Sequence, residues 1–158
     1  MAMILVEEAL RQVLDAIQPT ESIEVPLAQA FGLVLAEEAR SSLDIPPVDN
    51  SAMDGYAVRA NDLSKASAED PTVLPVIGEV AAGSAPEPPV REGTAVRIMT
   101  GAPVPRGADA VVRFEDTDEQ ERRAGSGPLT DIAIRVAVST GNSVRKAGED
   151  VRTGDVVL

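Results

Sequence analysis

Two short stretches of the chain carry residues that could take part in chemistry, and each is built around a turn. The first, "SAMDGYAV", places Asp54 directly before Gly55. This pair favours a tight turn, because glycine accepts a positive φ and aspartate can bond its own backbone. Such a turn would present the Asp54 carboxylate at a loop apex, where it could hold a cation or orient water. The alternative is that Asp54 only builds the corner.

The second stretch, "RIMTGAPVPRGADAVVRFE", follows a strand-like run and contains two prolines and two glycines. This composition predicts a rigid loop that turns back on itself. Thr100 and Gly101 fall where the strand should end, so a hydroxyl and free backbone N–H groups could receive an oxyanion there. The alternative is a proline-stiffened connection in which Thr100 bonds the backbone locally.

A third stretch, "VRKAGEDVRTGD", brings basic and acidic residues within reach of one another. Arg145 and Lys146 are followed by Glu149 and Asp150. The pattern predicts an ion-paired turn, and surface pairs of this kind contribute only about 0–1 kcal/mol. The other interpretation is a link that positions a neighbouring domain.

The composition excludes several classes of chemistry. Without Cys or His, the chain has no disulfide, thiolate nucleophile, imidazole base or usual zinc ligand. A metal would therefore be a hard cation held by oxygen, such as Mg²⁺. The net charge of −12 repels a phosphate backbone and argues against a nucleic-acid or anionic-membrane partner. No segment reads as a leader or a membrane span, so we expect a cytoplasmic protein.

The elements that must position these loops combine helix and strand. Residues 4–17 predict an amphipathic helix, whose apolar stripe docks either on its own sheet or on a second subunit. A strand is expected at 23–25, then a helical turn from Pro26 to Gly32. Further strands are expected at 33–39, 73–77, 95–99, 110–114, 132–138 and 155–158, and residues 113–127 as a solvated hairpin tip. The stripe consists of Val6, Leu10, Val13, Leu14 and Ile17.

The three stretches, taken in this order, resemble the N-terminal part of the molybdopterin molybdenumtransferase family, the MoeA-type proteins related to the E domain of gephyrin. The resemblance runs through "PLAQAFGLVLAEEARSSLDIPPVDNSAMDGYAVRANDL", "GTAVRIMTGAPVPRGADAVVRFED" and "VRKAGEDVRTGDVVL". It extends from about residue 5 to residue 158.

The resemblance implies a fold, a reaction and two site residues. The implied fold is α+β, an elongated mixed α/β first lobe with an inserted, mostly β, barrel-like second lobe. Family members insert molybdenum from molybdate into adenylylated molybdopterin with release of AMP, using a divalent cation, usually Mg²⁺. Asp54 of the "MDG" motif and Thr100 of the "MTGA" motif are implied to be catalytic, with Asp54 also a metal ligand.

The resemblance also implies a domain layout and partners. Residues 1–55 with about 142–158 are expected to form a dimerisation lobe, and about 56–141 the inserted β lobe. The family's pterin-binding third domain and small fourth domain are not matched, so we expect no turnover from this chain alone. A homodimer is expected, and a contact with a MogA-type molybdopterin adenylyltransferase is possible within the family's chemistry.

Two other functions remain open at this stage. One is a non-catalytic oligomerisation or scaffold module, indicated by the apolar stripe between Val6 and Ile17. The other is a generic acidic β domain that binds a cation by itself. One carboxylate and one hydroxyl do not complete a cation site, so we expect weak Mg²⁺ binding or none from this chain.

Overall fold

The computed structural model describes residues 4–122 and 129–158, and the chain divides into two compact units. Unit 1 is Met1–Glu38 and unit 2 is Ala39–Leu158. The sequence-based division at about residues 55 and 142 remains a prediction. None of the helices in the described ranges has the length and apolar content needed to cross a membrane.

Unit 1 consists of two helical segments joined by extended chain. The α-helix α1 spans Val6–Asp15 and confirms the helix expected over residues 4–17. The 3-10 helix η1 spans Leu27–Gln29, within the helical turn expected after Pro26. The strands expected at 23–25 and 33–39 are wrong, because no strand forms in either stretch. Only Ala39, at the end of the second stretch, bonds the backbone of Val157 and Leu158. None of the described residues of unit 1 is buried.

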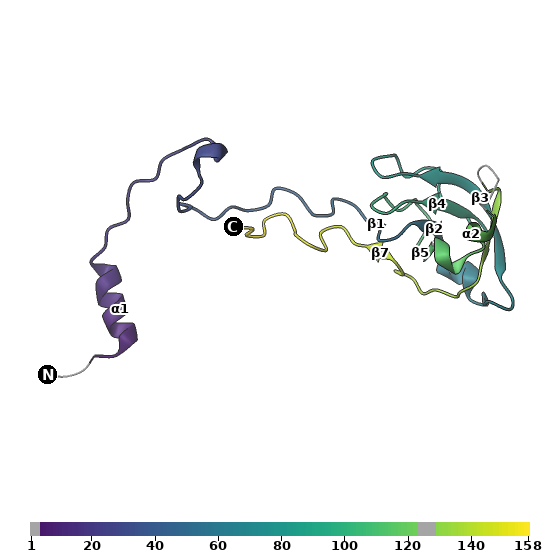
Figure 1. Cartoon of the computed structure of the whole chain (residues 1–158), viewed down its shortest axis with the longest axis horizontal. Coiled ribbons are helices and arrows are strands. Elements are labelled where there is room, and N and C mark those ends of the chain that lie inside the picture. The colour runs from purple at the N-terminus through teal and green to yellow at the C-terminus, as the bar shows by residue number, and fades with distance from the viewer. Residues whose placement is uncertain (1–3, 123–128) are drawn as a thin grey trace. The chain divides into compact units, whose positions relative to one another are not determined.

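Unit 2 is built on a curled five-stranded sheet (Figure 1). The strand order is β5-β2-β4-β3-β6, and only the β3–β4 pair among these is parallel. This mixture of helices and curled sheet confirms the expected α+β class. The strands are β2 (Gly55–Val58), β3 (Thr72–Val80), β4 (Ala95–Ile98), β5 (Ala110–Arg113) and β6 (Asp131–Ile134).

The centre of the sheet is buried on both faces. Ala57 of β2 is paired with Val96 of β4 and Val111 of β5, and these residues belong to one apolar cluster. Their neighbours Tyr56 and Val112 point to the opposite face and belong to a second cluster. Strands buried on both faces read as continuous apolar runs, which is why these short segments could be found from the sequence.

Short helical segments lie between the strands in the sequence: one follows β2, and two lie between β5 and β6. The 3-10 helix η2 spans Ala60–Leu63. The charged segment expected as a solvated hairpin tip instead holds η3 (Phe114–Asp116) and the α-helix α2 (Glu119–Arg122). Thr117 and Glu119 are buried there, so this part of the prediction is wrong. The rest of the expected tip, 123–127, lies outside the described residues.

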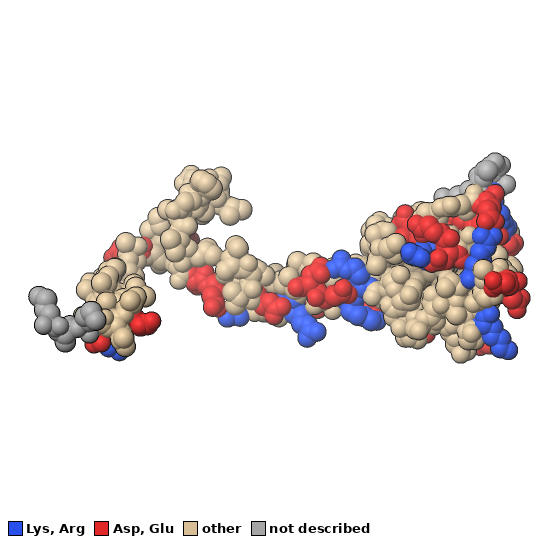
Figure 2. Space-filling view, turned by 60° about the horizontal axis from the view of Figure 1, so that its bottom comes forward, with Lys and Arg blue, Asp and Glu red and all other residues tan. Residues whose placement is uncertain are grey.

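A pair of antiparallel segments completes unit 2, and we call it the stem (residues 39–51 and 144–158). The strands β1 (Asn50–Ser51) and β7 (Val144–Arg145) pair at one end. Single bridges continue the pairing at Ile45–Val151 and Arg40–Val156. The strand expected over 155–158 is therefore wrong, since only one bridge forms there. Figure 2 shows acidic and basic side chains interleaved along the stem.

Candidate functional site

Asp54 and Thr100, the two residues singled out in the sequence, are in direct contact. The Asp54 Oδ1 atom accepts a hydrogen bond from the Thr100 backbone N–H at 2.7 Å. The same oxygen accepts a second bond from the Thr100 hydroxyl at 2.8 Å. Both residues lie at the surface, Asp54 half-buried and Thr100 exposed. Two loops separated by 46 positions in the sequence therefore form one polar site.

The sheet explains why these loops meet. Asp54 directly precedes β2, Thr100 follows β4 after one residue, and the two strands are antiparallel. Gly55 is paired with Ile98, so the start of β2 and the end of β4 lie at the same edge. The buried Ser51 adds a second connection: its carbonyl accepts from the Gly101 N–H at 2.8 Å.

Gly55 is required for a different reason than the sequence suggests. The "MDG" pair was expected to form a turn with a positive φ at the glycine, but Gly55 is not among the residues with positive φ. A Cβ at this position would lie 1.9 Å from the backbone oxygen of Val112 on β5. Glycine is thus needed because two strands approach closely. The positive φ lies instead at Gly101, at 78°.

The contact makes Asp54 a stable anion. The Thr100 backbone N–H, followed by the Thr100 hydroxyl, lowers the pKa of Asp54 below its ordinary value. The positive charge of Arg97 lowers this pKa further, and partial burial opposes the shift. A carboxylate that stays ionised below its usual range is a weak base near neutral pH. Asp54 is therefore suited to attract a cation or orient a donor, rather than to remove a proton.

The remaining oxygen atoms of the pair define what the site can bind. In the ranges that the structure describes, both bonds to the Asp54 side chain end on Oδ1, and none ends on Oδ2. The Thr100 hydroxyl gives its proton to Asp54, so its oxygen can act only as an acceptor toward another group. The site thus offers a free carboxylate oxygen beside a hydroxyl oxygen.

These donors do not complete a metal site by themselves. Across residues 4–122 and 129–158, no three acidic side chains gather closely enough to hold a metal ion. Mg²⁺ demands an octahedral set of oxygen ligands, of which Asp54 could supply one. A cation at this position would need ligands from substrate, water or other protein.

The structure also identifies residues that the sequence did not single out. Arg97 and Glu119 form a buried ion pair on the face of the sheet beside the two loops. An arginine within the apolar run "AVRIM" was the available signal. A cavity of about 420 Å³ lies on this face, lined in part by Tyr56, Arg97 and Glu119, and neither Asp54 nor Thr100 lines it.

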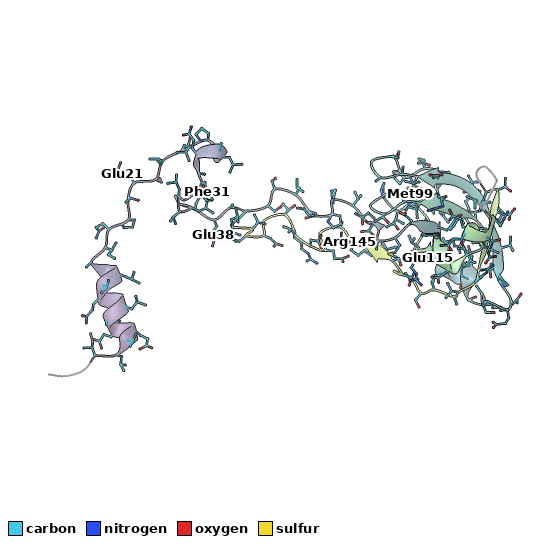
Figure 3. The ribbon with its side chains drawn as sticks, in the orientation of Figure 1. Glu21, Phe31, Glu38, Met99, Glu115 and Arg145 are labelled. Carbon is cyan, nitrogen blue, oxygen red and sulfur yellow. The ribbon has the colours of Figure 1, made fainter. Side chains whose placement is uncertain are left out.

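The third stretch forms the expected ion-paired turn. The Arg145 guanidinium bonds both oxygens of Asp150 at 2.6 Å, and Lys146 bonds Asp49 across the stem at 2.7 Å. Figure 3 shows Arg145 where the stem meets the sheet, and Met99, between the end of β4 and Thr100, beside the sheet. These charges hold the stem together, and none of them contacts Asp54.

The stem contains a second contact with the geometry of the candidate site. The Asp44 Oδ1 atom accepts from the Thr153 backbone N–H at 2.8 Å and from its hydroxyl at 3.1 Å. Thr153, like Thr100, precedes a glycine with positive φ. The same contact thus serves as a connection within the stem. Asp44 is therefore a matched reference for any test of Asp54.

A family model described as "MoeA N-terminal region (domain I and II)" matches residues 4–158. Molybdopterin molybdenumtransferase 2 of Mycobacterium tuberculosis is 45% identical over 153 residues, covering 97% of this chain and 36% of its own length. The molybdopterin molybdenumtransferase of Staphylococcus epidermidis is 36% identical, covering 97% of this chain and 35% of its own length. The chain spans little more than a third of these relatives.

A solved structure shares both the fold and the sequence pattern. The molybdopterin biosynthesis moeA protein of Pyrococcus horikoshii OT3 superposes with a TM-score of 0.81 at 39% sequence identity. The match covers 96% of this chain and 38% of that protein. The two proteins are thus similar in both fold and sequence over almost the whole of this chain.

Proposed function

The chain belongs to the family of MoeA N-terminal regions, and from this membership we propose that it forms the N-terminal part of a molybdopterin molybdenumtransferase. In this proposal it acts in the biosynthesis of the molybdenum cofactor. The observation that carries the proposal is the contact between Asp54 and Thr100, which joins the two family motifs in one exposed polar site.

The proposed reaction transfers molybdenum from molybdate to adenylylated molybdopterin with release of AMP. The lowered pKa of Asp54 keeps its carboxylate negatively charged near neutral pH, and its Oδ2 atom can attract a cation or a donor group of the substrate. The Thr100 backbone and hydroxyl fix the orientation of that carboxylate. Asp54 does not take the role of a general base, because its lowered pKa leaves the carboxylate weakly basic.

The proposed reaction also uses Mg²⁺, for which this chain would supply only some of the ligands. Asp54 would supply one oxygen ligand, and Mg²⁺ would supply positive charge beside the anionic substrates. No further acidic side chain of the described residues gathers there to complete a three-acid group, so the other ligands would come from hydroxyl or backbone oxygens, substrate, water or other protein. The chain alone is therefore expected to show no turnover.

A homodimer is the proposed assembly, and the exposed apolar surface of unit 1 supports it. Leu10, Val13 and Leu14 on α1, and Ile17 two residues after its end, are each more than half exposed, and Phe31 is 97% exposed. Apolar side chains gathered on one face mark an interaction site. The same surface favours a second function as an oligomerisation or scaffold module, and both functions can coexist. A contact with a MogA-type adenylyltransferase stays a prediction.

The proposal is tested by Asp54→Asn in a complete enzyme that carries this chain as its N-terminal part. Molybdenum incorporation should fall about a hundredfold or more, the scale seen when an electrostatic catalytic group is lost. Asp44→Asn is the matched control, because it removes the same charge from the same kind of contact, and it should change activity by less than about threefold. Undiminished incorporation by a folded Asp54→Asn enzyme would remove Asp54 from the reaction.

A further inference from the structure

A buried arginine connects the backbones of the two loops that form the candidate site. Arg97 lies on β4 and is 7% exposed. Its Nη1 atom donates to the carbonyl of Gly55 at 3.1 Å and to the carbonyl of Ile98 at 2.9 Å. Gly55 directly follows Asp54, and Ile98 lies two positions before Thr100. One nitrogen thus holds both strands at the point where they lead into the site.

The guanidinium is itself held from two sides. Its Nε atom lies 3.1 Å from a carboxylate oxygen of Glu119, at the start of α2, with the two side chains 8% and 2% exposed. Its central carbon lies 5.4 Å from the centre of the Tyr56 ring. A planar guanidinium can make an ion pair, stack on a ring and donate to carbonyls at once, whereas a lysine ammonium is a single point charge.

The position of Arg97 follows from the pairing of the strands. Arg97 is paired with Tyr56, and Gly55–Ile98 is the last pair between β2 and β4. Beyond that pair, the two loops are joined by the bonds from Thr100 to Asp54 and by backbone bonds that link residues 49–51 to residues 101–104. Arg97, next to the last pair of β2 and β4, can therefore set the distance between the two strand ends from which the loops start.

We propose that Arg97 is a positioning residue for the candidate site, holding the Gly55 and Ile98 carbonyls so that Thr100 can bond Asp54. Glu119 and Tyr56 keep its guanidinium in place. The positional part of this inference stands on the hydrogen bonds alone, and its effect on turnover rests on the proposed function.

The first test is nuclear magnetic resonance of the 158-residue chain. The bond from the Thr100 N–H to Asp54 gives a scalar coupling between the Thr100 amide nitrogen and the Asp54 carboxyl carbon, and it protects the Thr100 amide from exchange. The corresponding coupling between Thr153 and Asp44 is an internal reference, because that contact lies in the stem.

Three variants make the test specific. Arg97→Lys keeps a positive charge beside Glu119 and loses the planar fork. The double variant Arg97→Met, Glu119→Gln leaves no unpaired buried charge, which protects its folding. Arg113→Lys is the control, because Arg113 is paired with Gly55 from the other side and, among the residues that the structure describes, its side chain bonds only Asp116.

Both Arg97 variants should lose the Thr100–Asp54 coupling and exchange the Thr100 amide at least about tenfold faster. The Thr153–Asp44 coupling should be unchanged in every variant, and Arg113→Lys should resemble the unaltered chain. Persistence of the Thr100–Asp54 coupling in either folded Arg97 variant would overturn the positional inference.

The second test measures turnover in the complete enzyme. Arg97→Lys should lower kcat about tenfold and leave KM within about threefold, since a misplaced group costs more in the reaction than in binding. A lost coupling with unchanged kcat would overturn the catalytic part of the inference if Asp54→Asn is inactive. If Asp54→Asn is fully active as well, Asp54 has no role in the reaction, and the positional inference stands without a catalytic consequence.

Discussion

At the scale of single residues, the bonds from Thr100 to Asp54 are of a kind that also occurs elsewhere in this chain. Asp44 and Thr153 make the same pair of bonds within the stem. Geometry alone therefore does not distinguish a reactive carboxylate from one that closes a turn. What sets Asp54 apart is that Arg97 bonds the backbones of both strands that lead into its site, at Gly55 and Ile98.

The sequence singled out Asp54 and Thr100, whose role in a reaction stays a prediction, but it did not give the reason for the glycine beside Asp54. Asp-Gly pairs usually indicate a positive φ, which is a local property that sequence patterns capture. The actual constraint is the approach of the Val112 carbonyl, from a strand more than fifty positions away. Such long-range contacts leave no local signal, and the same holds for the partners of Arg97.

Gly55→Ala should destabilise unit 2 far more than Gly101→Ala. A Cβ at Gly55 would meet the Val112 oxygen at 1.9 Å, so a strand must move, and overpacking of this kind costs about 3 kcal/mol or more of unfolding free energy. Gly101 has open space around it and a φ of 78°, so alanine there should cost about 1 kcal/mol. Urea unfolding of the two variants measures this difference. Equal losses would contradict the close approach of β2 and β5.

At the scale of elements, a strand or helix could be predicted where residues close in sequence determine it, and not where a distant residue does. The strands β4 and β5 were found because each is a short apolar run bounded by turn residues. The segment after β5 was misread because Thr117 and Glu119 are buried within a highly charged run. Glu119 is buried as the partner of Arg97, an ion pair that no periodicity reveals.

The stem is stabilised by carboxylates, and protonation in acid should remove that stabilisation. The Thr153 backbone N–H, followed by its hydroxyl, lowers the pKa of Asp44 below its ordinary value of 3.8. A depressed folded pKa means that the stabilisation is complete above pH 3.8 and is lost as the pH falls through the folded pKa. Hydrogen exchange at Thr153, corrected for the intrinsic rate, should therefore accelerate below that pH.

Asp44→Asn provides the comparison for this prediction. The variant should show weaker protection of Thr153 at neutral pH and no further loss in acid, because asparagine does not titrate. Asp15→Asn in unit 1 is a control that removes the same charge from α1, and it should leave Thr153 unaffected. Acid sensitivity that survives in Asp44→Asn would assign the effect to another group.

At the scale of the whole molecule, the two units differ in how much of their apolar side-chain surface they bury. Unit 2 buries two apolar clusters around its sheet, whereas none of the described residues of unit 1 is buried. The helix in unit 1 was predicted correctly because amphipathic periodicity is local. What covers its apolar stripe depends on surfaces beyond the helix, so the sequence left two alternatives open.

Sedimentation of the chain tests the proposed dimer. Val13→Glu places a charge in the apolar stripe and should weaken self-association at least about tenfold, the effect of burying an unpaired charge. Gln12→Glu introduces the same residue and charge one position away, on the other side of α1, and should leave association nearly unchanged. A chain that remains monomeric at high concentration would show that it is not a self-contained dimerisation unit.

The central claim is that Asp54 and Thr100 act as one unit in molybdenum insertion, and a double-mutant cycle tests it most directly. Molybdenum incorporation is measured for Asp54→Asn, Thr100→Ala and the double variant in the complete enzyme. Residues that act as a unit are strongly non-additive. The double variant should therefore be no slower than the slower single variant, within about threefold. Independent losses that multiply, or single variants with full activity, would contradict the claim.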